Sequence, residues 1–562
     1  MLRSIIAIAA SFLYIAAVIL LITRSVKHYE LLVVALQFIL LLPALSSCLR
    51  ISDPQGGFVW APSRAGLWAL AACFVLGSFI FSYHIGQGIV FADESSYEFQ
   101  ARAFASLKTV GNAPPITAIP SHASPEPLAF KHIVLSPSGR FTKYPIAWPA
   151  VLALGERFGA GWAVTPLLGG LLIILVGLLT HEAFGAMAVL PSVWIAVLSP
   201  YCLSYCTGKM SHALCAVLIA SACLFCLRGI RTSKMSQFGF MFAALVISFH
   251  VRPFTAFITS TVLSLAILYH YRRNRPMLAR FAAMAAVSGF IAVTSVMAYN
   301  HFYTGRYLLS PYALYDGKEI PTDITTTPAV VLSNILMTRR YSVQTTLLYS
   351  FPFVFLLAAY GFWVKRQSQA ACILALLFPA IFLAHFAQTF SSSPIVGERY
   401  YFEAYIAVVV LAGYGTQALL LRLRTQRKYA ILVAVLLTIV QGAMTVVGAR
   451  QISLVGKPYR EVTKVAETYR NCRCAIFLKS STDKELSYFS PNLNFDGPAW
   501  KPGDSDYLND PGPAERGAWA NAFGWHDWAV VTYDPQTQTA RSETYHLYEA
   551  PSVGTAGYGK RN

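Results

Sequence analysis

Hydrophobic residues run in long blocks with almost no charge inside them, from the start of the chain to about residue 447. A helix of roughly 20 apolar residues crosses the hydrocarbon core of a bilayer, and the blocks have about this length. The alternation of polar and apolar residues that is typical of a barrel is absent. The sequence therefore predicts a polytopic α-helical membrane protein with about thirteen spans, near residues 5–22, 30–47, 67–86, 162–181, 187–203, 210–228, 236–250, 254–270, 281–299, 346–364, 369–388, 400–419 and 429–447.

Charged residues lie mainly in short segments between these blocks, and most are positive. Of the 562 residues, 56% are hydrophobic and 12% are charged, and 44 Lys and Arg against 26 Asp and Glu give a net charge of +18. If the N-terminus is cytoplasmic, almost all short basic clusters fall on the cytoplasmic side, as the positive-inside rule requires. The positive charge therefore indicates topology, and it does not indicate a nucleic-acid partner.

This topology places three long segments on the extracytoplasmic side: the loop 87–161, the loop 300–345 and the tail 448–562. The tail contains Gly, Pro, Asp and Asn turns and short strand-like runs such as "CAIFLK" and "WAVVTYD", which predict a small soluble α+β domain. The first hydrophobic block is too long for a signal peptide, so residues 1–66 are interpreted as two N-terminal spans. Residues 67–447 then form the main transmembrane domain.

The cysteines divide into two groups. Eight of the ten lie in or beside hydrophobic blocks and are typical of small buried residues. Cys472 and Cys474 stand apart in the tail, and their C-x-C spacing is compatible with a strained disulfide or with two thiols.

The loop 87–161 opens with two adjacent carboxylates, Asp93 and Glu94, directly after a predicted span. Tyr97, Ala101 and Phe104 follow at helical spacing, so the sequence predicts a juxtamembrane helix. One interpretation is structural, because Asp93 at an N-cap and Glu94 in the first turn would stabilise the helix by about 1 to 2 kcal/mol. The other is catalytic, with one carboxylate directed into a cavity.

Other extracytoplasmic segments supply basic groups and aromatic rings that favour the catalytic interpretation. Lys143 and Tyr144 lie in "GRFTKYPIAWP", Arg252 lies in "FHVRPF", and Glu398 and Arg399 lie in "GERYYFEA". A single basic residue at the end of a span often only extends toward the headgroups. Several of them on one face, with acids and aromatics, are better explained by an anionic lipid headgroup beside a catalytic carboxylate.

The order of these motifs resembles the integral-membrane GT-C glycosyltransferases. The motifs are "ADESSYEFQARAFASLKTVG", "KYPIAWPAVLALGERFGAGWAVTPLLGG", "SPYCLSYCTGKMSHALCA", "RPF", "YNHFYTGRYLLSPY" and "GERYYFEA". Residues 67–420 are most similar to the bacterial relatives of the dolichyl-phosphate-mannose protein mannosyltransferases, the aminoarabinose transferase of lipid A and the Rhizobium galacturonic acid transferases. The two N-terminal spans before the motif loop are a departure from that pattern.

The resemblance implies an enzyme of a bacterial inner membrane. It would transfer a sugar from a polyprenyl phosphate, such as undecaprenyl phosphate, to an extracytoplasmic glycan, lipid or protein, with inversion of the anomeric centre. By position, Asp93 matches the general base, Glu94 matches its acidic companion, and Lys143 matches a lysine that contacts the donor phosphate. Tyr144 stands where the family has the first proline of a K-P-P element, so the detailed contact of Lys143 is open.

These residue types suit the chemistry. A carboxylate that accepts the proton of an acceptor hydroxyl contributes about 10² to 10⁴ in rate. The departing lipid phosphate gains negative charge, which basic side chains stabilise; the candidates are Lys143, Arg399, Arg252 and Arg102. A divalent cation such as Mg²⁺, Mn²⁺ or Ca²⁺ could share this task, with Glu94 as a candidate ligand.

Further candidate substrate contacts come from several segments: Tyr144, His132, Glu398, Tyr400, Tyr312 and His212. For His212 the alternative is a histidine packed between helices. For His132 it is hydrogen bonding within the loop, and for the tyrosines it is an interfacial position without a ligand.

Two other classes of protein remain as alternatives. One is a transporter or flippase of lipid-linked sugars, although such proteins tend to have internal symmetry and broken spans near the middle of the membrane. The other is a non-catalytic assembly protein. The sequence contains no Walker loop, which argues against an ATP-driven pump.

Overall fold

The computed structural model describes most of the chain and divides it into two compact units. The described residues are 64–85, 92–111, 132–136, 139–317, 339–351, 353–385, 396–422, 427–469, 474–480, 506–522, 525, 527–534, 537, 539–547 and 558–560. The spans predicted near residues 5–22 and 30–47 lie outside them. The helical unit comprises the described residues of 1–85, 162–299 and 322–452, and the mixed unit comprises those of 86–161, 300–321 and 453–562.

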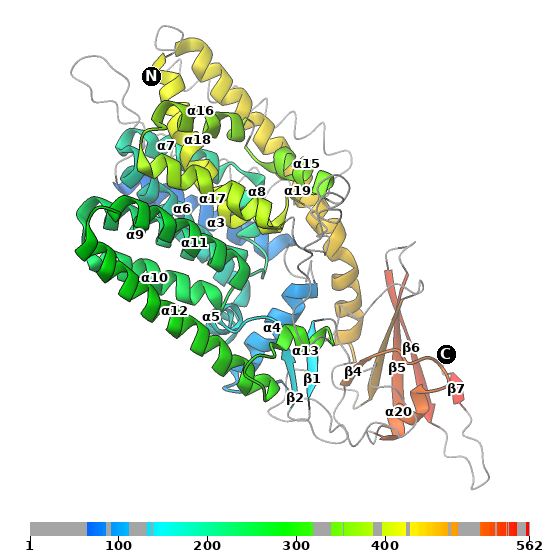
Figure 1. The fold of residues 1–562 in the computed structure, drawn as a ribbon. Helices are drawn as coiled ribbons and strands as arrows, with labels where there is room; N and C mark the ends of the chain where they lie inside the picture. The colour runs from blue at the N-terminus through cyan, green and yellow to red at the C-terminus, as the bar shows by residue number, and fades with distance from the viewer. Residues whose placement is uncertain are drawn as a thin grey trace. The chain divides into compact units, whose positions relative to one another are not determined.

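The helical unit is built from helices that follow the hydrophobic blocks of the sequence (Figure 1). Its elements, with the last residues of α12 and α19 belonging to the mixed unit, are α3 (Arg64–Ile85), α6 (Gly161–Phe184), η4 (Ala186–Ala188), α7 (Val189–Val197), α8 (Pro200–Tyr205), α9 (His212–Thr232), α10 (Met235–Phe249), α11 (Pro253–Tyr271), α12 (Arg275–Thr304), α15 (Arg339–Tyr349), α16 (Val354–Lys365), α17 (Gln369–His385), η6 (Arg399–Tyr401), α18 (Phe402–Arg422) and α19 (Arg427–Glu467).

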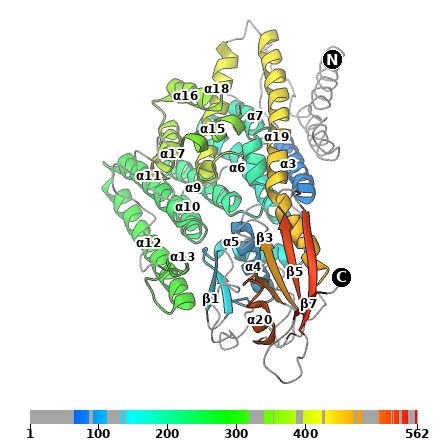
Figure 2. The ribbon, with the colours of Figure 1, turned by 90° about the vertical axis from the view of Figure 1, so that its right-hand side faces the viewer.

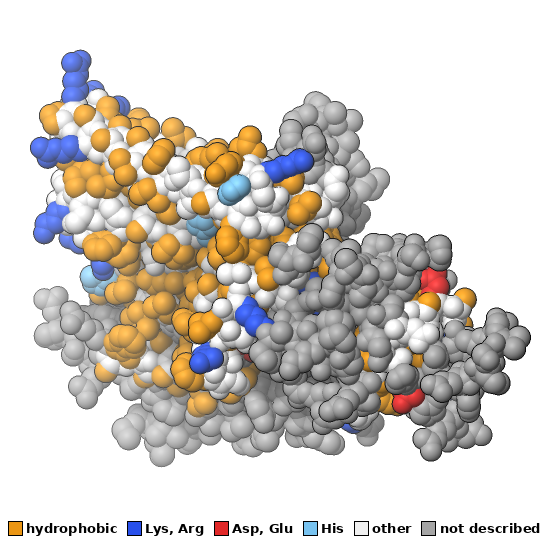
Figure 3. All heavy atoms as spheres, turned by 90° about the horizontal axis from the view of Figure 1, so that it is seen from below, with side chains coloured by type: hydrophobic (Ala, Val, Ile, Leu, Met, Phe, Trp, Pro, Cys, Tyr) orange, Lys and Arg blue, Asp and Glu red, His pale blue; other side chains and the backbone are white. Residues whose placement is uncertain are grey.

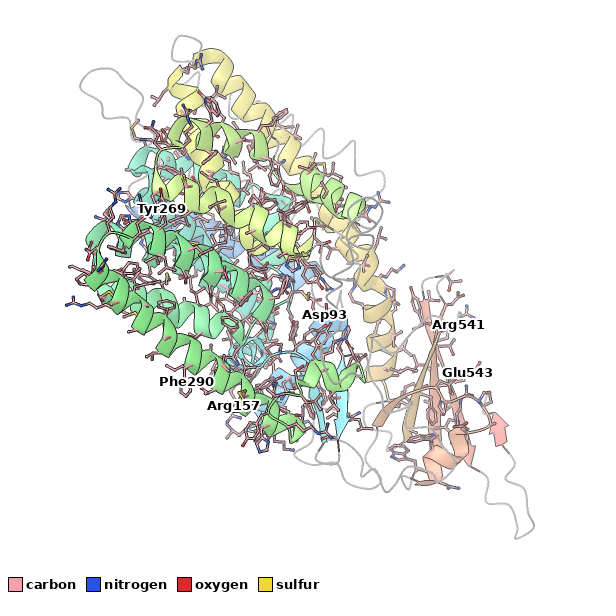
Figure 4. All side chains as sticks on the ribbon, in the orientation of Figure 1. Asp93, Arg157, Tyr269, Phe290, Arg541 and Glu543 are labelled. Atoms are coloured by element: carbon pink, nitrogen blue, oxygen red, sulfur yellow. The ribbon has the colours of Figure 1, made fainter. Side chains whose placement is uncertain are left out.

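Five of the described helices are long and apolar enough to cross a membrane: α6, α9, α11, α12 and the continuous segment Arg399–Arg422. Helix α12 exposes large apolar side chains along its length, among them Phe290 at 70% and Val287 and Val293 at 59% each. Hydrophobic side chains also cover much of the helical part in Figure 3, and Phe290 projects outward in Figure 4. Such a surface requires lipid, so the chain is a multi-pass membrane protein.

Helix α18 forms the centre of the helical unit, because every residue from Phe402 to Ala412 is buried. It packs against α16, α7, α17 and α9. The contact with α16 is close, since a Cβ atom on Gly415 would lie 2.0 Å from the carbonyl oxygen of Leu357, and one on Gly361 would lie 2.3 Å from that of Leu411. Small residues at helix contacts allow backbones to approach in this way in membranes.

Three predicted spans differ from the helices that the structure shows. The predicted span 187–203 is divided into α7 and α8, because Pro200 begins a new helix and Ser199 caps it by accepting from the backbone N–H of Cys202. The predicted span 346–364 is divided between α15 and α16, where Phe353 has a left-handed φ of 59°. The predicted span 429–447 extends into the 41-residue α19. The predicted number of thirteen spans therefore stays a prediction.

The mixed unit contains a part from the two loops that the sequence predicts to be extracytoplasmic and a part from the tail. Its first part consists of α4 (Ala92–Ala105), β1 (Ile133–Ser136), β2 (Gly139–Thr142), α5 (Ala147–Glu156) and α13 (Pro311–Tyr315). Strands β1 and β2 form an antiparallel hairpin in which Ile133 pairs with Thr142. Helix α4 covers residues that the sequence predicted to be helical, and its position beside the membrane stays a prediction, whereas the hairpin was not predicted.

The tail contributes a five-stranded sheet and one helix (Figure 2). The strand order is β4-β3-β5-β6-β7, with β3 (Ala475–Ser480), β4 (Asp506–Asn509), β5 (Asp527–Asp534), β6 (Thr539–Leu547) and β7 (Tyr558–Lys560), and the helix is α20 (Arg516–Ala522). Strand β3 is parallel to both β4 and β5, whereas β5, β6 and β7 are antiparallel. Val462 and Ala466 of α19 pack on Ile476 and Val531 of this sheet. The predicted domain boundaries stay predictions.

The alternatives for the tail cysteines are partly resolved, because Cys474 is disulfide-bonded. Within the described residues, the cysteines with free thiols all belong to the helical unit. Most of these thiols are buried, as the sequence predicted for the cysteines of the hydrophobic blocks.

Candidate functional site

Asp93 lies at the centre of a group of polar and aromatic side chains within the mixed unit (Figure 4). It is the second residue of α4 and is 6% exposed. Its Oδ1 accepts a hydrogen bond from the hydroxyl of Tyr144 and lies 3.1 Å from Nε2 of His132. Helix α4 begins one residue before Asp93, so the interpretation of Asp93 as the N-cap is wrong: its carboxylate contacts residues of the β-hairpin segment instead.

The hairpin segment is fixed to α4 by hydrogen bonds that continue to the site residues. The backbone N–H of Thr142 donates to Oε1 of Gln100 at 3.1 Å, and the Thr142 hydroxyl lies 3.3 Å from that of Ser96. The backbone N–H of Lys143 donates to the carbonyl of His132 at 3.0 Å. His132 has a φ of 66°, a left-handed conformation that is uncommon outside glycine and is often found at functional sites.

Lys143 is enclosed by aromatic rings. Its Nζ lies 4.1 Å from the ring centroid of Tyr312, 4.3 Å from that of Tyr315 and 5.7 Å from that of Tyr144. Its Nζ also lies 3.7 Å from Oδ1 of Asp316. Lys143 is 5% exposed, so these cation–π contacts and this ion pair act on the ammonium group in a largely dry environment.

Helix α13 places three of these partners. Ser310 caps it by accepting from the backbone N–H of Ala313, and Pro311 occupies its first turn. The short helix thereby places Tyr312 and Tyr315 on Lys143, and Asp316 follows at its end. The two extracytoplasmic loops predicted from the sequence thus contribute residues to one group of side chains.

Two further predicted residues lie on α4. Glu94 is 3% exposed. Arg102 forms an ion pair with Glu98 at 2.6 Å, and its Nε lies 3.7 Å from Oε2 of Glu156 on α5. Arg102 thus helps to join α4 to α5, and its contact with a donor phosphate stays a prediction.

A second group of predicted residues lies within the helical unit and surrounds Glu403. His212, Arg252 and Glu403 stand at the N-terminal ends of α9, α11 and α18. Nδ1 of His212 and Nε of Arg252 each lie 3.0 Å from Oε1 of Glu403, and Nη1 of Arg252 lies 3.2 Å from Nε2 of His212. Glu403 and His212 are both fully buried.

Tyr400 links this group to Arg399. The guanidinium carbons of Arg252 and Arg399 each lie 5.1 Å from the centroid of the Tyr400 ring, and Nη2 of Arg399 donates to the Tyr400 hydroxyl at 3.2 Å. Glu398 is fully buried, and its side chain accepts from the backbone N–H of Tyr400. The backbone of the same turn is held by Tyr205, which donates to the carbonyl of Gly397 at 2.8 Å.

Sequence reasoning did not single out Glu403 or Asp316 as site residues, whereas it considered Tyr315, like Tyr312, for the lining of a sugar site. A carboxylate at the start of the hydrophobic block 400–419 is itself a signal, because ionisable residues within membrane helices are rare and usually functional. Asp316 carries no such signal, since it lies in a polar loop. For the cation that the sequence suggested, the residues that the structure describes contain no group of three or more His, Cys, Asp or Glu side chains able to hold a metal.

Comparisons with known proteins identify the fold. No protein family and no curated protein matches the sequence. Solved structures do match: ArnT from Cupriavidus metallidurans in the apo state has a TM-score of 0.53 and 14% identity over 84% of this chain and 94% of its own. The same protein bound to undecaprenyl phosphate has a TM-score of 0.54 and 13% identity over the same shares of the two chains.

The Archaeoglobus fulgidus oligosaccharyltransferase in complex with Zn and sulfate gives a TM-score of 0.53 and 14% identity, over 83% of this chain and 68% of that protein. These proteins are GT-C glycosyltransferases, so the GT-C fold that the sequence motifs suggested is confirmed.

Proposed function

We propose that this protein is a membrane glycosyltransferase that transfers a sugar from a polyprenyl phosphate to an acceptor on the extracytoplasmic side. The observation that carries the proposal is the group in the mixed unit, in which a buried carboxylate with two hydrogen-bonding partners lies near an ammonium group that is enclosed by aromatic rings. The GT-C fold supports the same class of reaction, and one protein of this fold has been solved with undecaprenyl phosphate.

In the proposed reaction Asp93 is the general base. It accepts the proton of an acceptor hydroxyl while that oxygen attacks the anomeric carbon, and the bond from that carbon to the phosphate oxygen breaks. The hydroxyl of Tyr144 and Nε2 of His132 hold the carboxylate in one orientation. Orientation of the base before the reaction lowers the entropy cost of the transfer. Glu94 is proposed as the acidic companion of Asp93.

Basic side chains stabilise the lipid phosphate as it leaves with its additional negative charge. Lys143 is proposed for this role because it is buried and because tyrosine rings fix its position. Arg252 and Arg399 are proposed as further phosphate ligands, and both already contact the ring of Tyr400. Charge stabilisation is strong in such water-poor surroundings.

The remaining predictions form part of the proposal. They comprise a sugar site lined by tyrosines such as Tyr312, a bacterial inner membrane with the N-terminus in the cytoplasm, and a tail on the extracytoplasmic side that recognises the acceptor or covers the site. The disulfide at Cys474 supports an oxidising compartment for the tail. The acceptor is an envelope glycan, a lipid or a protein.

The test combines mass spectrometry of cell-envelope glycolipids with binding of undecaprenyl phosphate to the purified chain in nanodiscs. Cells that contain the wild-type protein should carry a glycosylated product that is missing without it. Asp93→Asn should abolish this product and leave undecaprenyl phosphate binding within about twofold, because a general base is not needed for donor binding. Glu182→Gln, which changes a carboxylate paired with Arg231 elsewhere, is the control.

Full product formation by Asp93→Asn would contradict the role of this residue as the base. A flippase would give another result, since the purified wild-type protein would move labelled lipid across a vesicle membrane without any change in glycosylation.

A further inference from the structure

The ion-paired group around Glu403 is buried within the helical unit, and its hydrogen bonds determine which nitrogen of His212 carries the proton. Glu403 and His212 have no exposed surface, and the Arg252 side chain is 14% exposed. Burial of an unpaired charge would cost far more than one hydrogen bond returns. The group therefore persists because its charges compensate one another: the ion pair from Arg252 and the hydrogen bond from His212 both reach Oε1 of Glu403.

The hydrogen-bond geometry fixes the protonation state of the imidazole. An arginine side chain only donates hydrogen bonds. Because Nη1 of Arg252 lies 3.2 Å from Nε2 of His212, that nitrogen must accept, and the ring must carry its proton on Nδ1. Nδ1 then donates to Oε1 of Glu403 at 3.0 Å. A neutral His212 thus accepts from Arg252 and donates to Glu403, and Arg252 and Glu403 also form an ion pair with each other.

The positions of the three residues in their helices explain why a carboxylate is required. Each residue lies at a helix N-terminus, where the helix dipole is positive. Arg252 and Arg399 add two positive charges around the Tyr400 ring. Glu403 is the carboxylate that holds Arg252 in this electropositive surrounding, and it does so through its own contact and through His212.

We infer that Glu403 is a positioning residue: with His212 it holds the Arg252 guanidinium on the Tyr400 ring, beside Arg399, so that the two arginines present a preformed binding site for the phosphate of the lipid donor. This inference rests on the proposed function, because it assigns Arg252 to the donor phosphate. Glu403 itself does not touch the substrate, and it acts through Arg252.

A positioning role and a simple charge effect predict opposite results for Glu403→Gln. If Glu403 acted only through its charge, the loss of that negative charge beside two arginines should tighten the binding of an anion. If Glu403 positions Arg252, the amide cannot form the ion pair that holds the guanidinium, and the affinity for undecaprenyl phosphate should fall by about tenfold. Glu403→Asp keeps the charge but shortens the side chain, and it should also weaken binding.

The experiment measures undecaprenyl phosphate affinity of the full chain in nanodiscs for the wild type, Glu403→Gln, Arg252→Gln and the double variant. Undecaprenol, which lacks the phosphate, serves as the reference lipid. Because Glu403 acts through Arg252, the double variant should bind as weakly as Arg252→Gln alone, and the effect of Glu403→Gln should vanish in that background. Glu182→Gln, which alters an ion pair with Arg231 in the same unit, should bind like the wild type.

A folding defect would be recognised and does not block the test. The double variant removes both charges of the buried pair, so it should unfold closer to the wild-type temperature than Glu403→Gln does. Tighter binding by Glu403→Gln, or an equal loss in the presence and absence of Arg252, would overturn the inference and leave the proposed function standing. A wild-type chain that binds undecaprenyl phosphate no better than undecaprenol would overturn both.

Discussion

At the residue scale, the contacts of Lys143 indicate which of its partners determine its position. The ion pair with Asp316 spans 3.7 Å, and water partly screens it because that carboxylate is 23% exposed. Two rings at 4.1 and 4.3 Å from the ammonium contribute about 0.5 to 2 kcal/mol each when they are desolvated. Tyr312 and Tyr315 thus contribute to the position of Lys143, and Asp316 contributes to the balance of its charge. A phosphate that binds Lys143 must compete with Asp316.

This competition leads to a prediction of tighter binding. Asp316→Asn should increase the affinity of the chain for undecaprenyl phosphate by about two- to tenfold, because the Asp316 carboxylate no longer compensates the charge of the ammonium. The measurement is equilibrium binding in nanodiscs at low ionic strength, where the difference should be largest, and again at high salt, where screening should reduce it.

The control for Asp316→Asn is the same substitution in a chain that also carries Lys143→Met. If Asp316 competes for Lys143, it has no effect in that background, and both Lys143→Met chains should bind equally weakly. Unchanged or weaker binding by Asp316→Asn alone would show that the carboxylate supports phosphate binding in place of opposing it.

Site residues that lie in local motifs could be predicted from the sequence, whereas those whose partners are distant in the chain could not. Asp93, Lys143 and Tyr144 lie in motifs where acids, bases and aromatics are adjacent in the chain, so their chemistry was visible. Asp316 and Glu403 act on partners more than 150 residues away. Nothing in a single sequence specifies such pairs, because they depend on how helices pack.

At the element scale, length and hydropathy were the reliable signals. The predicted span 254–270 corresponds to α11 (Pro253–Tyr271), and the predicted span 210–228 corresponds to α9 (His212–Thr232). Long apolar blocks form helices in lipid because a helix pairs all of its backbone polar groups within the segment. The hairpin of β1 and β2 was missed because its strands have four residues each, too few for a clear alternation of polar and apolar positions. Short elements depend on tertiary contacts, here on Gln100 of α4.

The close contact of α16 with α18 yields a prediction with a matched control. Gly415→Ala should lower the unfolding temperature, because its Cβ would lie 2.0 Å from the carbonyl oxygen of Leu357 and the helices must separate, at a cost of about 1 to 3 kcal/mol. Gly289→Ala on α12 meets no atom within 4 Å and should leave the temperature equal or slightly higher, since alanine favours a helix. The measurement is thermal unfolding in detergent, and an equal response of the two variants would contradict this account of the contact.

At the scale of the whole molecule, the distribution of charge and of cysteine oxidation both bear on topology. The basic residues near the ends of α9 and α10, such as Arg231 and Lys234, belong to the clusters that the positive-inside rule assigns to the cytoplasm. The tail contains the disulfide-bonded Cys474, which is typical of an oxidising compartment. The two features are independent, and they predict opposite sides of the membrane for these two parts of the chain.

Thiol labelling of intact cells tests this arrangement. The parent chain has Cys73 and Cys372, which are partly exposed, replaced by serine, while the buried thiols remain. Thr537→Cys, at an exposed position of the tail, should react with a membrane-impermeant maleimide added outside, once the outer membrane is permeabilised. Lys234→Cys is equally exposed but should react only after the inner membrane is disrupted. Labelling of both thiols in intact cells would contradict the prediction that these two parts lie on opposite sides of the membrane. Labelling of Lys234→Cys alone would require the opposite topology, and Asp93 would then lie on the cytoplasmic side, where the proposed transfer to an extracytoplasmic acceptor could not take place.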